Sequence, residues 1–208
     1  MESVSIASDV GARIAQVIPP EATICVGLSG GLDSTVLLTV LARHLADAHR
    51  VTALHVHHGL SPNADQWVKF CERLCANEGV PLAVERVRVD AASPLGLEGA
   101  ARVARYAVYS ARPEPYIALA HHLDDQAETV LMQLLRGTGM RGIAAMPELR
   151  GLRGTNVNIF RPLLNFSRAQ LAEFAKAEGL RWIEDESNAS TGPSRNFLRL
   201  KRRRKPLA

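Results

Sequence analysis

Short apolar segments alternate with amphipathic segments along most of this chain, and this alternation limits the folds open to it. Residues 23–28, TICVGL, form a continuous apolar run, as in a strand buried on both faces of a sheet. Five such alternations predict an α/β fold, a parallel five-stranded sheet with helices on both faces. The predicted strands are residues 23–28, 50–58, 81–89, 116–122 and 157–164. The predicted helices are residues 3–17, 34–48, 64–79, 97–112, 124–137 and 168–179.

The periodicity weakens between the fifth predicted helix and the fifth predicted strand. Residues 138–156 show neither a helical nor a strand pattern, and residues 157–164, VNIFRPLL, are predicted as a strand that leaves the core. Ser167 and Gln170 then form a capping box that opens the last helix, and Gly179 is expected to end it.

Length and charge together predict one domain with a basic tail. The 208 residues suit a single domain, placed at residues 1–199, followed by a tail at residues 200–208. The net charge is +4, but the seven basic residues from Arg195 onward exceed it, which leaves residues 1–194 at −3. Such a tail fits either attraction to nucleic acid or a solvated, disordered end.

The cysteine count and the apolar runs bear on the compartment. Three cysteines, one of them in a predicted buried strand, do not make a disulfide framework, so we expect a reducing cytoplasm. No apolar run reaches the roughly 20 residues that span a bilayer, and residues 1–17 lack the features of a secretory signal. We therefore expect a cytoplasmic protein without a membrane partner.

The sequence SGGLDS, residues 29–34 and hereafter the SGGLDS loop, follows the first predicted strand and opens a helix. Gly30 and Gly31 let the backbone approach an anion closely, and the N–H groups at a helix start attract negative charge. Ser29 and Ser34 add hydroxyl donors. Asp33 would repel a bare phosphate, which points to a bound cation or to a role in holding the loop. A simpler alternative is an N-cap turn with Asp33 in the first helical turn.

The sequence HHLDDQAET, residues 121–129, follows the fourth predicted strand. Asp124, Asp125 and Glu128 place three carboxylates at a helix start, two of them four residues apart on one face. They could bind Mg²⁺ or a substrate ammonium, or they could simply cap the helix. His121 and His122 lack the spacing of a helical zinc pair, which favours structural or nucleotide-contact roles.

Two further groups have both functional and structural interpretations. Arg102 and Arg105 recur with Glu98 on one helical face, where arginine suits phosphate contact but a Glu–Arg surface pair is equally expected. Cys71 and Cys75 lie one helical turn apart, and we interpret them as small buried residues.

Together these motifs resemble those of a known family. SGGLDS is similar to the SGGxDS signature of PP-loop ATP pyrophosphatases. Within that superfamily, HVHHGLS, LEGAARVARY, the long HHLDDQAET block, RPLL and the ending EDESN…RNFLR resemble the successive motifs of the tRNA(Ile)-lysidine synthases. The chain departs from many members at His57, where asparagine is common, and at Ser61, where arginine is common.

The resemblance implies an enzyme that ligates lysine to C2 of the wobble cytidine in a tRNA(Ile) with a CAU anticodon. ATP first adenylates the base at its C2 oxygen, and the ε-amine of L-lysine then displaces AMP. The implied cofactors are ATP and Mg²⁺, and the implied partners are this tRNA and L-lysine.

The resemblance also implies roles for individual residues. The residues implied to hold the pyrophosphate portion of ATP are Ser29, Gly30, Gly31, Leu32, Asp33 and Ser34. The residues implied in catalysis are Asp33, Asp124, Asp125 and Glu128, with Asp33 and Asp125 as metal ligands. The residues implied to contact RNA or phosphate are Arg102, Arg105 and Arg195.

Three alternatives stay open at this point. Family members continue past RNFLR into domains that grip tRNA, so the chain is either a catalytic domain alone or a shortened protein whose basic tail replaces part of that surface. It could also be an ATP-binding fragment without modification activity. A tRNA thiolase of the same superfamily is the other enzyme considered, although C-x-x-x-C replaces the C-x-x-C of such enzymes. The oligomeric state stays open between a monomer and a homodimer.

Overall fold

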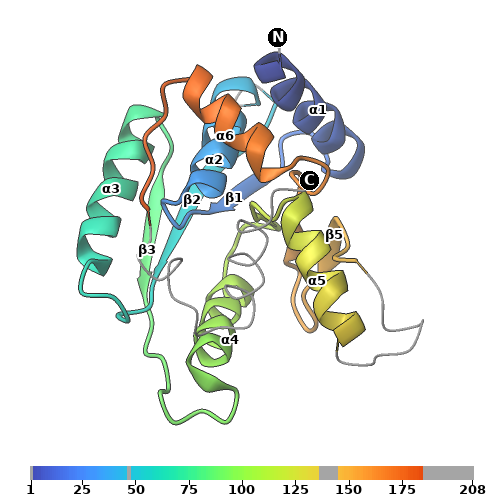
Figure 1. The fold of residues 1–208 in the computed structure, drawn as a ribbon. Helices are drawn as coiled ribbons and strands as arrows, with labels where there is room; N and C mark the ends of the chain where they lie inside the picture. Colours follow the sequence, from blue (N-terminus) through green and yellow to red (C-terminus); the bar gives the residue numbers. More distant parts are fainter. Residues whose placement is uncertain (1, 46–47, 136–144, 185–208) are drawn as a thin grey trace, which may run out of the picture.

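The fold is a six-stranded sheet with helices on both of its faces, seen in a computed structural model that describes residues 2–45, 48–135 and 145–184 (Figure 1). The strands are β1 (Thr23–Gly27), β2 (Arg50–His57), β3 (Leu82–Arg86), β4 (Tyr116–Ala118), β5 (Leu149–Gly151) and β6 (Asn158–Phe160). The helices are α1 (Glu2–Val17), α2 (Leu32–His44), α3 (Ala64–Asn77), α4 (Gly96–Ser110), α5 (Leu123–Leu135) and α6 (Arg168–Ala177).

The strand order is β3-β2-β1-β4-β6-β5, and the five predicted strands are all present and mutually parallel. The order reverses direction between β1 and β4, and ligands of open α/β sheets bind at the carboxyl ends of the strands beside such a switch point. The SGGLDS loop follows β1 and HHLDDQAET follows β4. The topology therefore brings the two most polar motifs of the sequence to one place.

Two expectations about the sheet were wrong. The sheet has a sixth strand, β5, which pairs antiparallel with β6 at the edge. Its three residues, Leu149–Gly151, are all exposed and carry no apolar alternation, so periodicity could not find them. Residues 157–164 do not leave the core: β6 lies between β4 and β5, and Ile159, Phe160 and Leu163 are completely buried.

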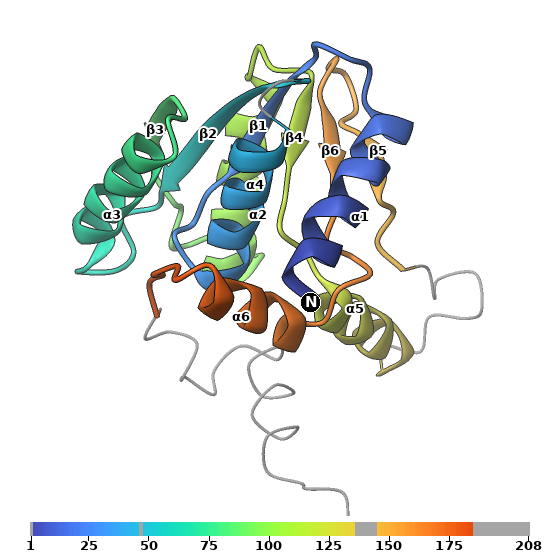
Figure 2. The ribbon, with the colours of Figure 1, turned by 90° about the horizontal axis from the view of Figure 1, so that it is seen from above.

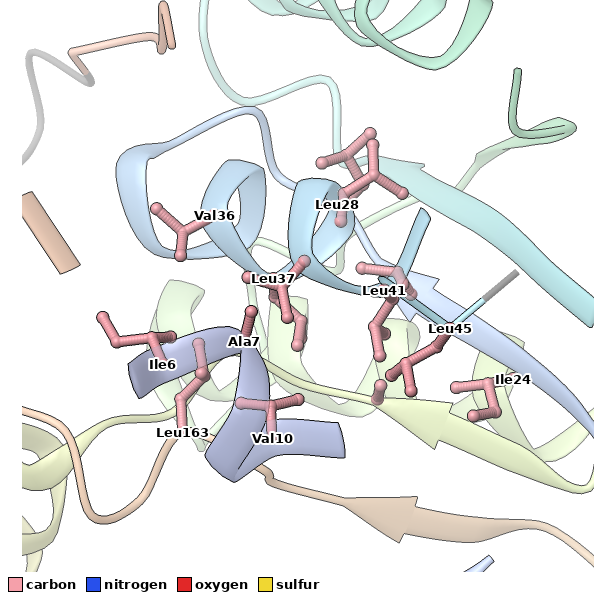
Figure 3. Close-up of a cluster of buried hydrophobic side chains, with 14 of the residues drawn as sticks. Ile6, Ala7, Val10, Ile24, Leu28, Val36, Leu37, Leu41, Leu45 and Leu163 are labelled. Atoms are coloured by element: carbon pink, nitrogen blue, oxygen red, sulfur yellow. The ribbon is translucent and has the colours of Figure 1, made fainter. Parts of the chain in front are cut away.

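The core forms two layers, one on each face of the sheet. The larger layer gathers side chains from α1, α2, α3 and α6 over one face, and the smaller lies between the sheet and α4. Figure 3 shows Val10 of α1 and Leu37 and Leu41 of α2 pointing toward one another in the larger layer. In β1 the neighbours Ile24 and Cys25 are both fully buried but belong to different layers, as the continuous apolar run of this strand predicted.

Helix ends follow the expected local chemistry. The Ser167 hydroxyl accepts from the N–H of Gln170, whose side chain accepts from the N–H of Ser167 in return, so the capping box at α6 is confirmed. Gly79 and Gly179 have φ values of +67° and +64° just after α3 and α6. Figure 2 shows α1 and α6 on the same side of the sheet, near α2. Within the described ranges, no helix is both long enough and apolar enough to span a bilayer.

Candidate active site

The SGGLDS loop connects β1 to α2 at the carboxyl edge of the sheet. Helix α2 begins at Leu32, two residues earlier than predicted, so Asp33 stands in its first turn. Gly30 has a φ of +85°, and a Cβ on it would lie 2.6 Å from Cδ1 of Ile183 and 3.3 Å from Sγ of Cys71. Only glycine meets both the backbone conformation and the packing at this position.

The two serines of the loop hydrogen-bond within it. The Ser34 hydroxyl donates to the carbonyl of Gly31 (3.1 Å) and accepts from the N–H of Ser29 (3.2 Å). The Ser29 hydroxyl accepts from the N–H of Gly31 (3.3 Å) and lies 3.0 Å from the Ser34 hydroxyl. These bonds hold the loop in shape at the start of α2, where the first N–H groups of a helix lack partners within it and favour an anion.

Three carboxylates from two helices meet around one buried histidine, His122. Its Nε2 lies 3.7 Å from Oδ2 of Asp33 and 3.5 Å from Oδ2 of Asp125, and its Nδ1 lies 3.8 Å from Oδ2 of Asp124. Burial lowers the pKa of His122, but the hydrogen bond and charge of Asp33 and the charges of the other two aspartates outweigh it and raise the pKa overall. The cluster is the point where the β1 end and the β4 end of the sheet are joined electrostatically.

Two of these aspartates also cap helices. Oδ2 of Asp125 accepts from the backbone N–H of His122 (3.1 Å), which stabilises the start of α5. Oδ2 of Asp124 accepts from the backbone N–H of Arg168 (2.9 Å), which ties α5 to the first residue of α6. The capping alternative considered from the sequence therefore explains one oxygen of Asp125, whereas Asp124 caps a different helix.

Asp33 differs from the other two. Its Oδ1 is buried and has no hydrogen-bond partner among the described residues, and its nearest cation there is Nε of Arg168 at 3.8 Å. A buried carboxylate oxygen without a partner is unfavourable unless a ligand satisfies it. Glu128, on the same helix as Asp125, is 7% exposed. Asp33 is thus the carboxylate of this site with the clearest unmet demand for a cation.

The carboxylates around Asp33 bear on the Mg²⁺ site that the resemblance implies. Within residues 2–45, 48–135 and 145–184, no three His, Cys, Asp or Glu side chains are arranged to hold a metal ion by themselves. Mg²⁺ does not require such a cage, because it is usually bound by one or two carboxylates together with substrate phosphates. The unpartnered oxygen of Asp33 beside the SGGLDS loop fits that kind of binding.

The histidines at the end of β2, His55, His57 and His58, are buried or half-buried. Nδ1 of His55 lies 2.9 Å from the carbonyl of Leu28 and must donate to it, since a carbonyl only accepts. Nε2 of His57 lies 3.3 Å from Oδ1 of Asp65. Burial, with the nearby charge of Arg105 in second place, lowers the pKa of His58 to about 4. His55 thereby fixes the strand end that precedes the loop, while His58 stays neutral.

Arg102 of α4 contacts a tyrosine rather than a glutamate. Nη2 of Arg102 donates to the Tyr106 hydroxyl (3.1 Å), and its guanidinium carbon lies 4.7 Å from the centre of the Tyr106 ring. No ion pair between Arg102 and Glu98 is present in the described part of the chain. Arg105 is half-buried near His58. The structure thus does not contain the surface pair that was the alternative to phosphate contact, and the phosphate contact stays a prediction. Arg195 and the basic tail lie outside the described residues.

The cysteines are buried, as interpreted from the sequence. Burial raises the pKa of Cys71 to about 12 and that of Cys75 to about 11. Sγ of Cys71 lies 3.5 Å from Nδ1 of His55, beneath the SGGLDS loop. A thiol in such surroundings is a packing group and a poor nucleophile.

Three residues at the site were not singled out from the sequence. His122 was one of two adjacent histidines, and nothing in the pattern distinguished the buried one. Arg168 follows the capping serine of α6, and Ile183 donates its N–H to the carbonyl of Gly30 (2.8 Å). The capping box revealed where α6 starts, but only the tertiary fold brings that start and the following segment to the loop.

Comparison with known proteins identifies relatives of this chain. The profile of the PP-loop domain matches residues 6–203. A protein of Chromobacterium violaceum described as tRNA(Ile)-lysidine synthase is 52% identical over 176 residues, which cover 84% of this chain and 40% of that protein. The protein of the same description from Escherichia coli O157:H7 is 50% identical over 182 residues, covering 86% of this chain and 42% of that protein. The chain thus spans about two fifths of the length of these relatives.

Solved structures resemble this one at lower identity. A U34-tRNA thiolase from Methanococcus maripaludis is 18% identical with a TM-score of 0.77, and the match covers 94% of this chain and 70% of that chain. An NH3-dependent NAD synthetase from Campylobacter jejuni is 17% identical with a TM-score of 0.54, covering 96% and 80%. At these identities the likeness concerns the fold alone.

Proposed function

The chain belongs to the PP-loop domain family, and we propose that it catalyses the ATP-dependent ligation of lysine to C2 of the wobble cytidine in a tRNA(Ile) with a CAU anticodon. The observation that carries the proposal is the convergence of the SGGLDS loop with Asp33 and Asp125, in a chain about 50% identical to proteins described as tRNA(Ile)-lysidine synthases. The match covers 40% and 42% of these two relatives, so the activity of the whole relatives comes to this chain only as a proposal.

In the first step, the C2 oxygen of the cytidine attacks the α-phosphorus of ATP, and pyrophosphate leaves. The start of α2 would bind the departing pyrophosphate through its backbone N–H groups. The hydroxyls of Ser29 and Ser34 would join them by exchanging their hydrogen bonds within the loop for bonds to phosphate oxygens. Leu32, at the first position of α2, is buried and anchors the loop to the core. Such a transfer needs mainly positioning and charge neutralisation, which this loop is built to supply.

Mg²⁺ is proposed to bind at Asp33 and Asp125, where it would neutralise phosphate charge. The unpartnered Oδ1 of Asp33 supports this assignment. His122 contacts both carboxylates from a buried position and would keep them close together before ligands arrive.

In the second step, the ε-amine of lysine attacks C2 and AMP leaves. An alkyl ammonium has a pKa of about 10.4, so it must lose a proton before it can attack. Asp124, Asp125 and Glu128 would hold the ammonium at the start of α5 and one of them would accept that proton. The wobble base must leave the anticodon stack to reach this edge of the sheet, as single-stranded loops allow.

The proposal is tested by incorporation of radiolabelled lysine into unmodified tRNA(Ile) with a CAU anticodon, in the presence of ATP and Mg²⁺. Initiator or elongator tRNA(Met) with the same anticodon is the matched control, because it differs outside the anticodon. Incorporation that needs ATP and spares tRNA(Met) supports the proposal. Sulfur transfer to the tRNA in place of lysine would contradict it and favour the thiolase.

A second candidate is an ATP-binding domain that does not modify RNA by itself. The specific observation in its favour is that the chain spans only about two fifths of its relatives. Calorimetric binding of ATP, combined with no tRNA-dependent release of pyrophosphate, would favour this candidate over the ligase.

A further inference from the structure

Arg168 opens α6 at a place where two other helices also begin. Asp33 stands in the first turn of α2, and Asp124 stands in the first turn of α5. The backbone N–H of Arg168 donates to Oδ2 of Asp124 (2.9 Å), and its side-chain Nε lies 3.8 Å from Oδ1 of Asp33. Since the start of a helix carries partial positive charge, three helix starts and one guanidinium gather positive charge around these carboxylates.

The backbone of Arg168 is held in place by its surroundings. The capping box of Ser167 and Gln170 fixes the first turn of α6. One and two turns further along, Leu171 and Phe174 are buried in the larger core layer, which also contains the side chains of α2. The point from which the Arg168 side chain extends is therefore fixed relative to the start of α2 and the SGGLDS loop.

The guanidinium of Arg168 is much less constrained than its backbone. The side chain is 46% exposed, and its one ion pair in the described part of the chain is the contact with Asp33. That contact, at 3.8 Å, is longer than a hydrogen bond, and the side chain makes no hydrogen bond to any other described residue. A guanidinium has five N–H donors, so this one can bind a ligand without breaking a hydrogen bond within the described protein.

The proposed ligands of the site give this guanidinium an anion to bind. The start of α2 is proposed to bind the pyrophosphate portion of ATP, and Asp33 in that first turn is already beside Arg168. Oδ1 of Asp33 is also proposed to bind Mg²⁺, and two cations beside one carboxylate oxygen repel each other. The guanidinium would then leave Asp33, and its planar fork matches the oxygens of a phosphate group.

We propose that Arg168 is a phosphate-binding residue that contacts the pyrophosphate portion of ATP and leaves Asp33 when ATP and Mg²⁺ bind. This inference rests on the proposed function and adds a residue to its first step, because a cation at this place would neutralise the charge of the departing pyrophosphate. The fixed backbone of Arg168 limits the positions that the guanidinium can take, which reduces the entropy that it loses on binding.

The test measures the binding of inorganic pyrophosphate and, separately, of ATP by calorimetry over a range of Mg²⁺ concentrations. The variants are Arg168→Met, Arg168→Gln and Arg168→Lys. Arg43→Met is the matched control, because Arg43 is 41% exposed and also pairs with carboxylates, but stands in the last turn of α2. Thermal unfolding of each variant reports the fold, so Arg168→Gln still tests the inference if Arg168→Met does not fold.

We expect Arg168→Met and Arg168→Gln to weaken binding of both probes about ten- to a hundredfold at saturating Mg²⁺. Arg168→Lys should weaken it less, because lysine keeps the charge but lacks the fork. Arg43→Met should bind both probes like the wild type.

Unchanged pyrophosphate binding in a folded Arg168→Met or Arg168→Gln protein would overturn the inference. A loss that disappears as Mg²⁺ is raised would also overturn it, because Arg168 would then serve only to hold Asp33 for the metal. Lysine incorporation by the wild-type chain tests the proposed function separately. A chain that binds pyrophosphate through Arg168 but incorporates no lysine would support the inference and contradict the proposed function.

Discussion

The backbone N–H of Ile183 donates to the carbonyl of Gly30 at 2.8 Å, so the segment after α6 is joined directly to the SGGLDS loop. The Ile183 side chain fills the space where a side chain on Gly30 would stand. The conformation of this loop therefore depends on packing from the end of the described chain as well as on its own glycines.

Gly30→Ala should disrupt the loop more than the fold. The variant places a Cβ at a φ of +85° and 2.6 Å from Ile183. We expect ATP affinity to fall at least tenfold and the free energy of unfolding to fall by about 2 kcal/mol. Gly79→Ala is the control, because Gly79 has a φ of +67° with open space around it. Calorimetry should show unchanged ATP binding there, and equal losses in both variants would contradict the role assigned to packing.

Asp33→Asn should abolish pyrophosphate release while leaving the chain folded. Oδ1 of Asp33 has no hydrogen-bond partner among the described residues, so the fold loses only the charge that Asp33 presents to His122 and Arg168. Asp65→Asn is the matched control, since that carboxylate also pairs with an arginine, Arg86, but on the exposed surface, where an ion pair contributes little to stability. An assay of released pyrophosphate measures adenylation, and urea unfolding measures stability. Normal adenylation by Asp33→Asn would show that the carboxylate has been misassigned.

The cysteines should resist alkylation until the chain unfolds. With a pKa of about 12, only about one Cys71 thiol in ten thousand is ionised at pH 8. Mass spectrometry after iodoacetamide treatment should find Cys71 and Cys75 unmodified in buffer and modified in urea. Cys75→Ser should leave lysine incorporation intact, and loss of activity in a folded Cys75→Ser protein would revive the thiolase alternative.

Glu114 should make the fold sensitive to acid. Burial raises the pKa of this carboxyl, but hydrogen bonds from Arg112 and Thr52 outweigh it and hold the pKa below the ordinary 4.5. A carboxyl whose pKa is lower in the folded state stabilises that state above its unfolded pKa, and this contribution is lost as the pH falls through the folded value.

Glu114→Gln should therefore lower the free energy of unfolding by about 1–3 kcal/mol at pH 7. In urea titrations, the difference in free energy of unfolding between wild type and Glu114→Gln should decrease as the pH falls below 4.5. A gap that is constant with pH would mean that the Arg112 pair stabilises the fold by packing rather than by charge. Glu85→Gln, on the exposed end of β3, provides the control.

The sequence was sufficient for the parallel part of the fold, because buried strands such as β1 carry a continuous apolar run that few other structures share. It was insufficient for β5, since Leu149, Arg150 and Gly151 are held by pairing with β6 and not by their own propensity. It also predicted several strands to end too late; after β4, for example, the apolar residues Leu119 and Ala120 continue the strand pattern without a turn signal.

The candidate site was also only partly predictable from the sequence. The proximity of Asp33 and Asp125 could be predicted, because their motifs follow strands whose carboxyl ends lie at the same edge of a parallel sheet. The central place of His122 among the aspartates could not be predicted, because it comes from burial, which a histidine does not report in the sequence. A Glu98 pair and a phosphate contact were equally expected for Arg102, and its partner in the structure is Tyr106, one turn further along α4.

The reversal of strand order between β1 and β4 divides the carboxylates of the site between two halves of the sheet. Asp33 belongs to the half of the sheet made from β1, β2 and β3, whereas Asp125 belongs to the half built on β4 and β6. A chain in which only β1, β2 and β3 have paired has the SGGLDS loop in place, but Asp124 and Asp125 of α5 are not yet beside it. A ligand that contacts both halves binds only when the whole sheet has formed, so its binding free energy stabilises that state alone. Binding of a ligand that contacts both Asp33 and Asp125 would therefore stabilise only the state in which both halves of the sheet have formed.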